Sequence, residues 1–273
     1  MDAISVLRMC PKVAERLYAA PPQAGRVHSV FERVLNLAWH DGRLLTLQGR
    51  GPMLAPFAVE LPRLPCSHGL RPGVSVRRDG DTLTLDGAFI EWQGARIADS
   101  AMPAGGGGPG GALSVLLAGL HAEGAHGLSS TIGHRARSRL AGGLGRRDPE
   151  VFIEGARGLL GLGEGLTPAG DDCLVGALAV IHRLTRGWLL AHPEIEASVA
   201  AAAATMTTTI AREFVVHALA GRFAESLIDL LTAESADAVG GAATRVLQSG
   251  ATSGADTLCG VRLALGALGV ERA

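Results

Sequence analysis

The sequence predicts an α+β protein in which an antiparallel β-domain, a small barrel or sandwich, is followed by an all-helical domain. Two regions of the sequence with different patterns of apolar residues support this prediction. Residues 26–98 combine short apolar runs with frequent turn signals, whereas the later part of the chain carries apolar residues at helical spacing. A segment rich in Gly and Pro, residues 103–111, separates them and has the composition of a linker. We therefore expect a β-rich domain over residues 1–102 and a helical domain over 112–273.

The β-domain is expected to begin after a short helix or an irregular lead-in that Pro21 and Pro22 end. Beyond Arg26, apolar runs alternate with Asp-Gly steps, which are typical of two-residue hairpin turns, and prolines exclude long helices. The runs cover residues 27–37, 44–47, 57–59, 74–76, 83–85 and 88–90, and the Asp-Gly steps are 41–42, 79–80 and 86–87. Many short strands joined in this way favour a barrel or a sandwich.

Helices account for most of the later chain. We expect them over residues 112–123, 150–160, 171–186, 195–220, 223–233, 236–248 and 256–268. The stretch 134–147 carries five arginines with glycines between them, and such a run is typically a solvated loop. Alternatively, one of these arginines reaches an anionic substrate.

Composition narrows the class of protein. Apolar residues make up 47% and charged residues 19% of the chain, so it is globular, and the net charge of −1 without a basic stripe predicts no nucleic-acid partner. The N-terminus does not resemble a signal peptide, and no apolar run reaches the roughly 18 residues of a membrane span. We expect a cytoplasmic protein with no membrane partner. Cysteines at 10, 66, 173 and 259 show no CxxC spacing and are expected to be reduced and structural.

The segment 161–176, with the sequence GLGEGLTPAGDDCLVG, is the strongest candidate for a functional site. Three alternating glycines precede a Thr167-Pro168 turn, and two adjacent carboxylates then open a helix in which Asp171 is expected to be the N-cap. Gly-rich loops and helix N-termini bind anions, so the segment predicts a ligand site. The alternative is a loop and a helix cap without a ligand.

A second Asp motif near the C-terminus matches the first. The pattern G-x-D-x-L-x-G occurs at residues 170–176 and again at 254–260. If this is a true repeat, two loop-to-helix units face each other across a pseudo-twofold axis and direct their carboxylates into one cavity. Two ordinary capped helices are the alternative. Between the motifs lies the hydroxyl cluster 205–209, and Arg212 is expected on the same helical face as Thr209. Together they either bind phosphate or carboxylate or only cap the helix.

These patterns define the predicted site residues. The expected catalytic residues are Asp171, Asp172 and Asp256. The expected substrate-binding residues are Gly163, Gly165, Thr167, Gly170, Thr208, Thr209, Arg212, Thr252, Ser253 and Gly254. Asp171 and Asp172 are also the type of ligand that Mg²⁺ takes, so Mg²⁺ is the one cofactor they leave open.

Three strings, GLGEGLTPAGDDCLVG, TTTIAREF and GATSGADTLCG, resemble the AllH-like family, formerly a domain of unknown function. Its named members are a subunit of oxamate carbamoyltransferase in anaerobic ureide breakdown, a branch of purine degradation. The resemblance covers the C-terminal half. The N-terminal part fits only in its β-rich character and in its place before that half. It implies a subunit that works with partner chains on small anions, namely phosphate or carbamoyl phosphate and an oxamate-like acceptor.

Three positions bear on that resemblance. The family pattern commonly has Ser where this chain has Ala169 and Ala211, so two hydroxyls are missing from the expected site. Glu164 places a negative charge in the Gly loop, which opposes an anion unless a cation intervenes. Two other functions therefore stay open. One is a stand-alone metal-dependent enzyme acting on a ureido or amide bond, and the other is a non-catalytic scaffolding subunit.

Overall fold

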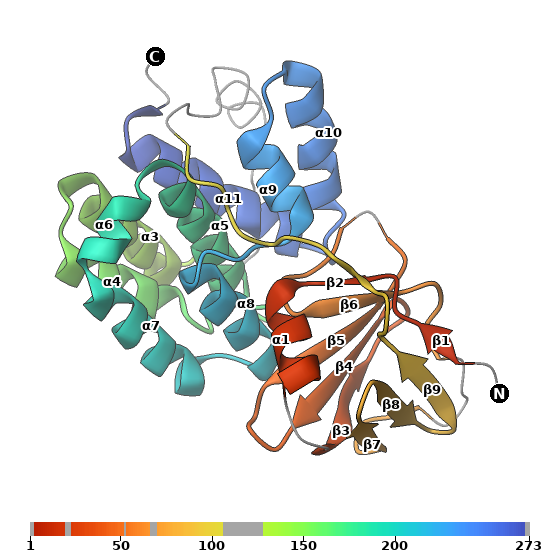
Figure 1. The fold of residues 1–273 in the computed structure, drawn as a ribbon. Coiled ribbons are helices and arrows are strands. Elements are labelled where there is room, and N and C mark those ends of the chain that lie inside the picture. Colours follow the sequence, from red (N-terminus) through yellow and green to blue (C-terminus); the bar gives the residue numbers. More distant parts are fainter. Residues whose placement is uncertain (1–2, 20–22, 52, 66–69, 106–127, 271–273) are drawn as a thin grey trace. The chain divides into compact units, whose positions relative to one another are not determined.

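The computed structural model describes residues 3–19, 23–51, 53–65, 70–105 and 128–270, which divide into two compact units (Figure 1). The first unit, residues 1–100, holds the described strands, and the second, residues 101–273, holds all but one of the described helices. This arrangement confirms the α+β prediction with the β-rich part first.

The described residues of the first unit form one ten-stranded sheet. Its order is β1 (Ile4–Ser5), β9 (Ala88–Glu91), β8 (Thr82–Leu85), β7 (Ser75–Asp79), β3 (Gln23–Val30), β4 (Val34–Trp39), β5 (Leu44–Gly49), β6 (Ala58–Leu61), β2 (Arg8–Met9) and β10 (Arg96–Ile97). Only Val6 and Leu7 separate β1 from β2 along the chain. The N-terminal segment therefore pairs first with β9 and then with β6, and the sheet curls into a half-barrel.

The sheet is mixed rather than antiparallel, which corrects part of the prediction. The pairs β1–β9, β5–β6 and β2–β10 are parallel. Turn residues in a sequence indicate only hairpins between consecutive strands, and the structure contains the hairpins that they predicted. For example, Asp86 and Gly87 have positive φ, at 47° and 78°, as a type I′ turn between β8 and β9 requires. A parallel pair leaves no comparable local signal.

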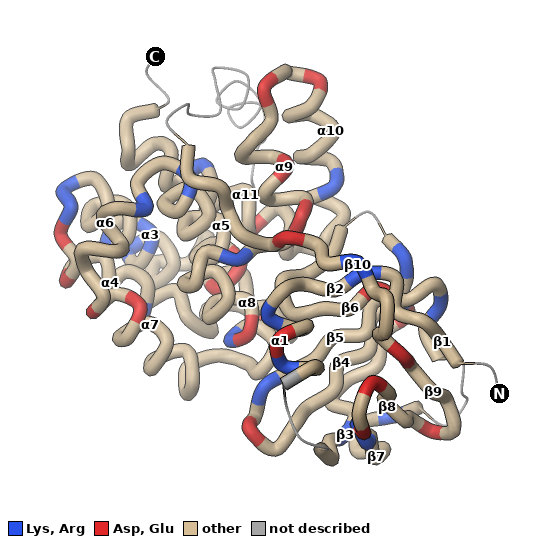
Figure 2. Tube along the Cα trace, viewed as in Figure 1, with Lys and Arg blue, Asp and Glu red and all other residues tan. Residues whose placement is uncertain are grey.

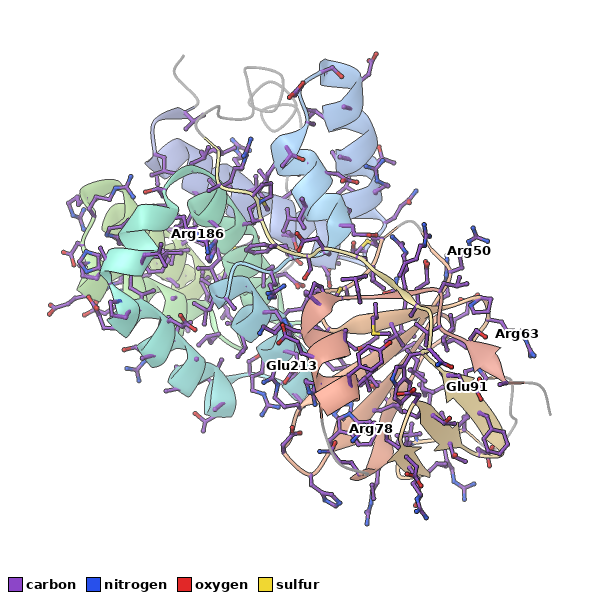
Figure 3. The ribbon with its side chains drawn as sticks, in the orientation of Figure 1. Arg50, Arg63, Arg78, Glu91, Arg186 and Glu213 are labelled. Atoms are coloured by element: carbon purple, nitrogen blue, oxygen red, sulfur yellow. The ribbon has the colours of Figure 1, made fainter. Side chains whose placement is uncertain are left out.

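The core of the first unit lies between the sheet and α1 (Pro11–Ala19), the helix that follows β2 where the sequence predicted a short helix or an irregular lead-in. Val13 and Leu17 of this helix pack on the apolar face of the strands. Arg78 of β7 is buried, and its Nη1 donates to the carbonyl oxygen of Leu17 at 2.8 Å (Figure 3). Burial lowers the pKa of Arg78. This bond ties the end of α1 to the sheet.

The second unit is a helical bundle built around one buried helix. Its described helices are α3 (Thr131–Arg146), α4 (Pro149–Leu159), α5 (Ala169–Leu184), α6 (Arg186–Ala191), α7 (Pro193–Met206), α8 (Thr209–Leu219), α9 (Glu225–Thr232), α10 (Ala236–Leu247) and α11 (Ser253–Ala267). Every residue of α5 from Ala169 to His182 is buried. A helix that is buried on all sides forms the centre of a core, and α4, α6, α8, α9 and α11 surround it.

Residues 134–146 lie in α3 and Arg147 is its C-cap, so the loop predicted for 134–147 is wrong. Ser130 caps this helix by accepting from the amide of Gly133 at 3.0 Å. The glycines allow close helix packing: a side chain at Gly143 would overlap the backbone of Phe152, and one at Gly155 would overlap the backbone of Leu140. Glycine here marks contact between α3 and α4 rather than a flexible segment.

Two other helix predictions change. The helix expected over 195–220 is two helices. Helix α7 ends at Met206, Thr207 is extended, and α8 begins after its N-cap Thr208. The helix expected over 112–123 and residues 106–111 of the expected linker lie outside the described residues. The described start of that linker is held to α5, since the amide of Gly105 donates to the carbonyl oxygen of Arg183 at 3.1 Å.

The described residues show neither a concentration of one charge (Figure 2) nor a helix suited to a membrane. Figure 2 shows basic and acidic residues interspersed along both units. Among the described helices, none combines the length and apolar character that crossing a bilayer requires.

Candidate functional site

The candidate site lies where α5 crosses α11, the two helices that open with the repeated Asp motif. Each position of the second motif follows its equivalent in the first by 84 residues, from Gly170 to Gly254. A side chain at Gly176 would overlap the carbonyl oxygen of Thr257, and one at Gly260 would overlap that of Cys173, the residue equivalent to Thr257. The contact is therefore reciprocal, as a pseudo-twofold relationship requires.

The first turns of the two helices meet at this crossing. The hydroxyl oxygens of Thr167 and Ser253 are 2.7 Å apart and hydrogen-bonded. Both hydroxyls also face the carboxyl group of Asp172. The negative charge of Asp256 acts on this carboxyl group and raises its pKa. Asp172 and Asp256 are buried, the latter completely. The repeat thus brings together two equivalent carboxyl groups from distant parts of the chain.

Asp171 is not the N-cap that the sequence predicted. Helix α5 begins at Ala169 with Pro168 at the cap, so Asp171 lies in the first turn. Its Oδ2 accepts hydrogen bonds from the amide of Gly161 at 2.9 Å and from the hydroxyl of Thr207 at 2.8 Å. Asp171 therefore ties the Gly loop and the junction between α7 and α8 to the central helix.

The alternating glycines have a backbone explanation. Gly161, Gly163 and Gly165 have φ of 71°, 118° and 88°, a region that other residues rarely adopt. In addition, a side chain at Gly161 would overlap the carbonyl oxygen of Met206. The amide of Gly161 is used by Asp171, and the loop residue Glu164 is exposed. Chain geometry alone accounts for these three glycines.

Burial changes the protonation of both aspartates. It raises the pKa of Asp171 to about 6, while the bonds from Thr207 and Gly161 act in the opposite direction. Burial also raises the pKa of Asp172 well above its ordinary value; the Ser253 hydroxyl opposes this shift and the charge of Asp256 adds to it. Asp171 is therefore largely ionised at neutral pH, and Asp172 keeps its proton to a higher pH than an exposed aspartate does.

Each of these two carboxyl groups keeps one oxygen without a hydrogen bond. Among the described residues, Oδ1 of Asp171 and Oδ2 of Asp172 are buried and have no hydrogen-bond partner. Buried polar atoms are nearly always paired, so such atoms in a group with raised pKa are typical of functional sites.

Two thiols and an arginine extend this buried polar cluster. Cys173 follows Asp172 on α5, Cys259 lies one turn after Asp256 on α11, and their side chains hydrogen-bond each other. Arg137 of α3 donates through Nη1 to the sulfur of Cys259 at 3.7 Å and through Nη2 to the carbonyl oxygen of Leu128 at 3.1 Å. The positions of the cysteines beside the two Asp motifs were the only signal of this cluster in the sequence.

The remaining predicted residues have local structural contacts. Thr208 caps α8, accepting from the amide of Ala211 at 3.1 Å and donating to the carbonyl oxygen of Leu166. Thr209 is the half-buried first residue of α8, Thr252 is an exposed cap residue without a side-chain capping bond, and Gly165 has open space around its Cα. Gly170 and Gly254 each pack against a carbonyl oxygen of the preceding helix, at Leu159 and Val246. Ala169 and Ala211 are buried.

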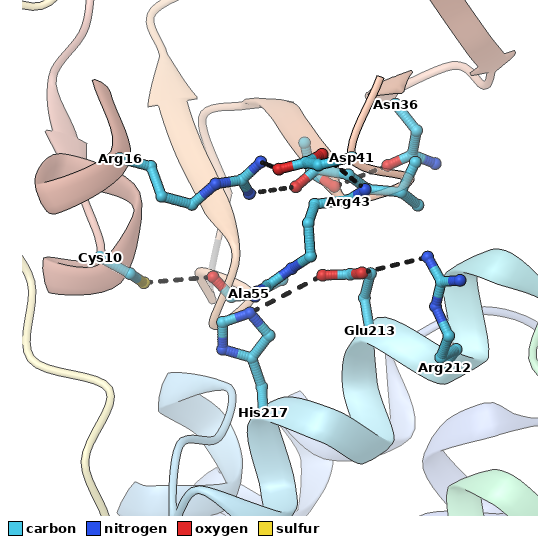
Figure 4. Close-up of polar contacts among 11 residues, drawn as sticks. Cys10, Arg16, Asn36, Asp41, Arg43, Ala55, Arg212, Glu213 and His217 are labelled. Atoms are coloured by element: carbon cyan, nitrogen blue, oxygen red, sulfur yellow. Dashed lines mark hydrogen bonds and ion pairs between the residues drawn. The ribbon is translucent and has the colours of Figure 1, made fainter. Parts of the chain in front are cut away.

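Helix α8 carries a second charged group that the sequence did not single out. Arg212 forms an ion pair with Glu213 at 3.5 Å, and Oε2 of Glu213 lies 3.9 Å from Nε2 of His217 one turn later (Figure 4). Glu213 and His217 are both buried. The guanidinium group of Arg212, which was predicted to bind an anionic substrate, thus already pairs with the carboxylate of Glu213.

No group of three or more His, Cys, Asp or Glu side chains within the described ranges is arranged to hold a metal ion. Mg²⁺ is commonly held by one or two protein carboxylates together with waters and substrate phosphates, so Asp171 and Asp172 as Mg²⁺ ligands stay a prediction.

Comparisons with known proteins agree with the resemblance seen in the sequence. The family model described as oxamate carbamoyltransferase subunit AllH matches residues 159–265, which include both Asp motifs. The model described as the AllH family N-terminal domain matches residues 3–97, the β-rich unit. No curated protein and no solved structure matches the chain significantly. Since the two matched regions cover most of both units, the chain belongs to the AllH family.

Proposed function

We propose that this chain is the subunit of a carbamoyltransferase complex in which carbamoyl phosphate transfers its carbamoyl group to oxamate or a related anion. The proposal is supported by the family's description and by one structural observation: Asp172 and Asp256 lie buried in the first turns of the two repeated helices, where these helices cross, and the charge of Asp256 acts on Asp172. The family's description as a subunit implies that other protein chains are needed for activity.

The chemistry of the transfer suits such a pair. The acceptor's amide nitrogen attacks the carbonyl carbon of carbamoyl phosphate, and the bond from that carbon to the phosphate oxygen breaks. The nitrogen loses one proton, and the phosphate leaves with one. A base and an acid placed side by side therefore balance the reaction.

We assign the acid to Asp172 and the base to Asp256. Asp172 keeps its proton to a higher pH than an exposed aspartate, so we take it as the group that gives a proton to the leaving phosphate. The Asp256 carboxylate, whose charge raises the pKa of Asp172, takes the proton of the amide. Passing a proton between the two groups then restores the starting state. A protonated Asp172 also repels an anionic substrate less than an ionised one.

The other predicted residues take supporting roles. The hydroxyls of Thr167 and Ser253 orient Asp172, since both face its carboxyl group. Asp171 holds the Gly loop through Gly161 and Thr207 and so fixes the start of α5. Asp172 therefore takes part in the reaction, whereas Asp171 has a structural role.

The test is phosphate release from carbamoyl phosphate and oxamate, measured with the chain alone and with the chains encoded beside it. We expect release only in the assembled complex, and a loss of about 100-fold or more in Asp172→Asn, a typical loss for a proton-transfer group. Asp237→Asn is the matched control, because Asp237 also lies in the first turn of a helix, α10, but is exposed.

Three outcomes would count against parts of the proposal. Full activity in a folded Asp172→Asn complex would support the scaffolding function instead. Metal-dependent activity of the lone chain would support the stand-alone enzyme. An absence of release in every combination would remove oxamate as the acceptor and direct attention to Ala169 and Ala211.

A further inference from the structure

The thiol pair at the crossing of α5 and α11 suggests a property separate from carbamoyl transfer. Cys10, Cys173 and Cys259 are buried and form no disulfide in the described structure, and of these three only Cys173 and Cys259 contact each other. They lie on different helices, so a bond between them would join segments that are 86 residues apart in sequence.

The backbones of α5 and α11 approach each other closely beside the two cysteines. A disulfide needs two Cα atoms within about 7 Å, whereas helix axes usually pack 8–10 Å apart. Here the carbonyl oxygen of Cys173 occupies the space that a side chain at Gly260 would need. The residue before Gly260 is Cys259, and its sulfur already hydrogen-bonds the Cys173 thiol. The glycine contact thus lets the two helices pack more closely here than helices with side chains between them.

The two cysteines have unequal environments. Cys173 has no exposed surface, whereas Cys259 is 9% exposed and lies beside the half-buried Arg137. The Cys173 hydrogen bond lowers the pKa of Cys259 to about 6, Arg137 strengthens that effect, and burial opposes it. A thiolate beside a cation is the form that attacks disulfides.

We propose that Cys173 and Cys259 form a thiol-modification site that small disulfides, such as oxidised glutathione, convert to a Cys173–Cys259 disulfide. The Cys259 thiolate attacks one sulfur of the small disulfide, forms a mixed disulfide and releases one thiolate. The Cys173 thiol then gives its proton to the first released thiolate and attacks the Cys259 sulfur, releasing the second thiolate, which takes a proton from water. Two electrons pass from the protein to the small disulfide, which leaves as two thiols.

Such a bond would act on the crossing itself. It would join α5 and α11 one residue after Asp172 and three residues after Asp256, and so fix the distance between the two helix starts. Formation of the disulfide does not depend on the proposed transferase activity, so the two proposals can fail separately.

The experiment uses the full chain with Cys10→Ser and Cys66→Ser, which leaves only the proposed pair. The folded protein is oxidised with glutathione disulfide, unfolded in excess N-ethylmaleimide and digested with trypsin. We expect the peptide of residues 158–183 to be linked to that of residues 246–262, and the link to disappear on reduction. It should also be absent when Cys259→Ser is added. Recovery of both cysteines as alkylated thiols, or of glutathione on Cys259 with Cys173 alkylated, would overturn the proposal.

The role of Arg137 gives a second readout. Arg137→Gln should slow the first attack at neutral pH, because it removes a cation that helps to lower the pKa of Cys259 and so leaves less thiolate. Arg135→Gln is the control, since Arg135 lies on the same helix and is exposed. Equal oxidation rates in the two variants would contradict activation of Cys259 by Arg137.

Discussion

Gly176 and Gly260 occupy reciprocal positions where α5 crosses α11. Gly176 faces the carbonyl oxygen of Thr257 and the amide of Val261, and Gly260 faces the same groups of Cys173 and Ala177, the residues 84 positions earlier. The two helices therefore meet backbone to backbone, and this contact sets the positions of the two carboxyl groups that start them.

Replacing either glycine should damage the helical unit. In Gly176→Ala or Gly260→Ala the added methyl group overlaps a backbone carbonyl oxygen, so we expect a loss of at least 2–3 kcal/mol in the free energy of unfolding or a failure to fold. Gly240→Ala is the matched control, because Gly240 lies in α10 with open space around it and alanine favours helices by about 0.5–1 kcal/mol. Thermal unfolding distinguishes these results; equal effects at the three positions would contradict the close crossing.

The hydrogen bond between Thr207 and Asp171 should be measurable in the same way. Thr207→Val removes a donor from a buried, largely ionised carboxylate, so we expect a loss of about 1–3 kcal/mol and a further rise in the pKa of Asp171. Thr244→Val is the control, since the Thr244 hydroxyl is exposed and bonds only to the carbonyl oxygen of Gly240 in its own helix. A Thr207→Val protein as stable as that control would show that the bond contributes little.

Stability should fall as the pH rises. The folded pKa of Asp171, about 6, exceeds its value in an unfolded chain, near 3.8, so the folded state holds this proton more tightly. The resulting stabilisation is full below about pH 4 and is lost as the pH rises through 6. The pKa of Asp172 is also raised, which extends the loss to higher pH.

Asparagine substitutions isolate this effect. Urea unfolding followed by helix circular dichroism should show a smaller fall between pH 5 and pH 8 in Asp172→Asn than in the wild type. Asp237→Asn should follow the wild type, since Asp237 is exposed. An unchanged slope in Asp172→Asn would mean that Asp172 is ionised at neutral pH, contrary to its proposed role as an acid.

The sequence predicted the features that local signals determine. The Asp-Gly steps gave the hairpins, and apolar spacing gave α4, α5, α9, α10 and α11 within a few residues. The repeat of G-x-D-x-L-x-G correctly indicated that Asp172 and Asp256 belong to equivalent helix starts, because the same glycine contact is needed at both.

Features that depend on distant contacts were missed. The parallel strand pairs arise from the path of the chain between strands, and α3 forms despite its glycines because they pack against α4. Asp171 is bound by Thr207, which lies 36 residues away, so its side chain could not be distinguished from a helix cap in the sequence. The contact of Cys173 with Cys259 follows from the crossing and not from their spacing.

A double-mutant cycle in the assembled complex tests most directly whether Asp172 and Asp256 act as one acid–base pair. Phosphate release would be compared in Asp172→Asn, Asp256→Asn and the double variant, with thermal unfolding to confirm that each is folded. Groups that work as a unit are not additive, so we predict a loss of about 100-fold or more in each single variant and little further loss in the double. A loss in the double variant equal to the product of two single losses, or a folded single variant with full activity, would contradict the pair.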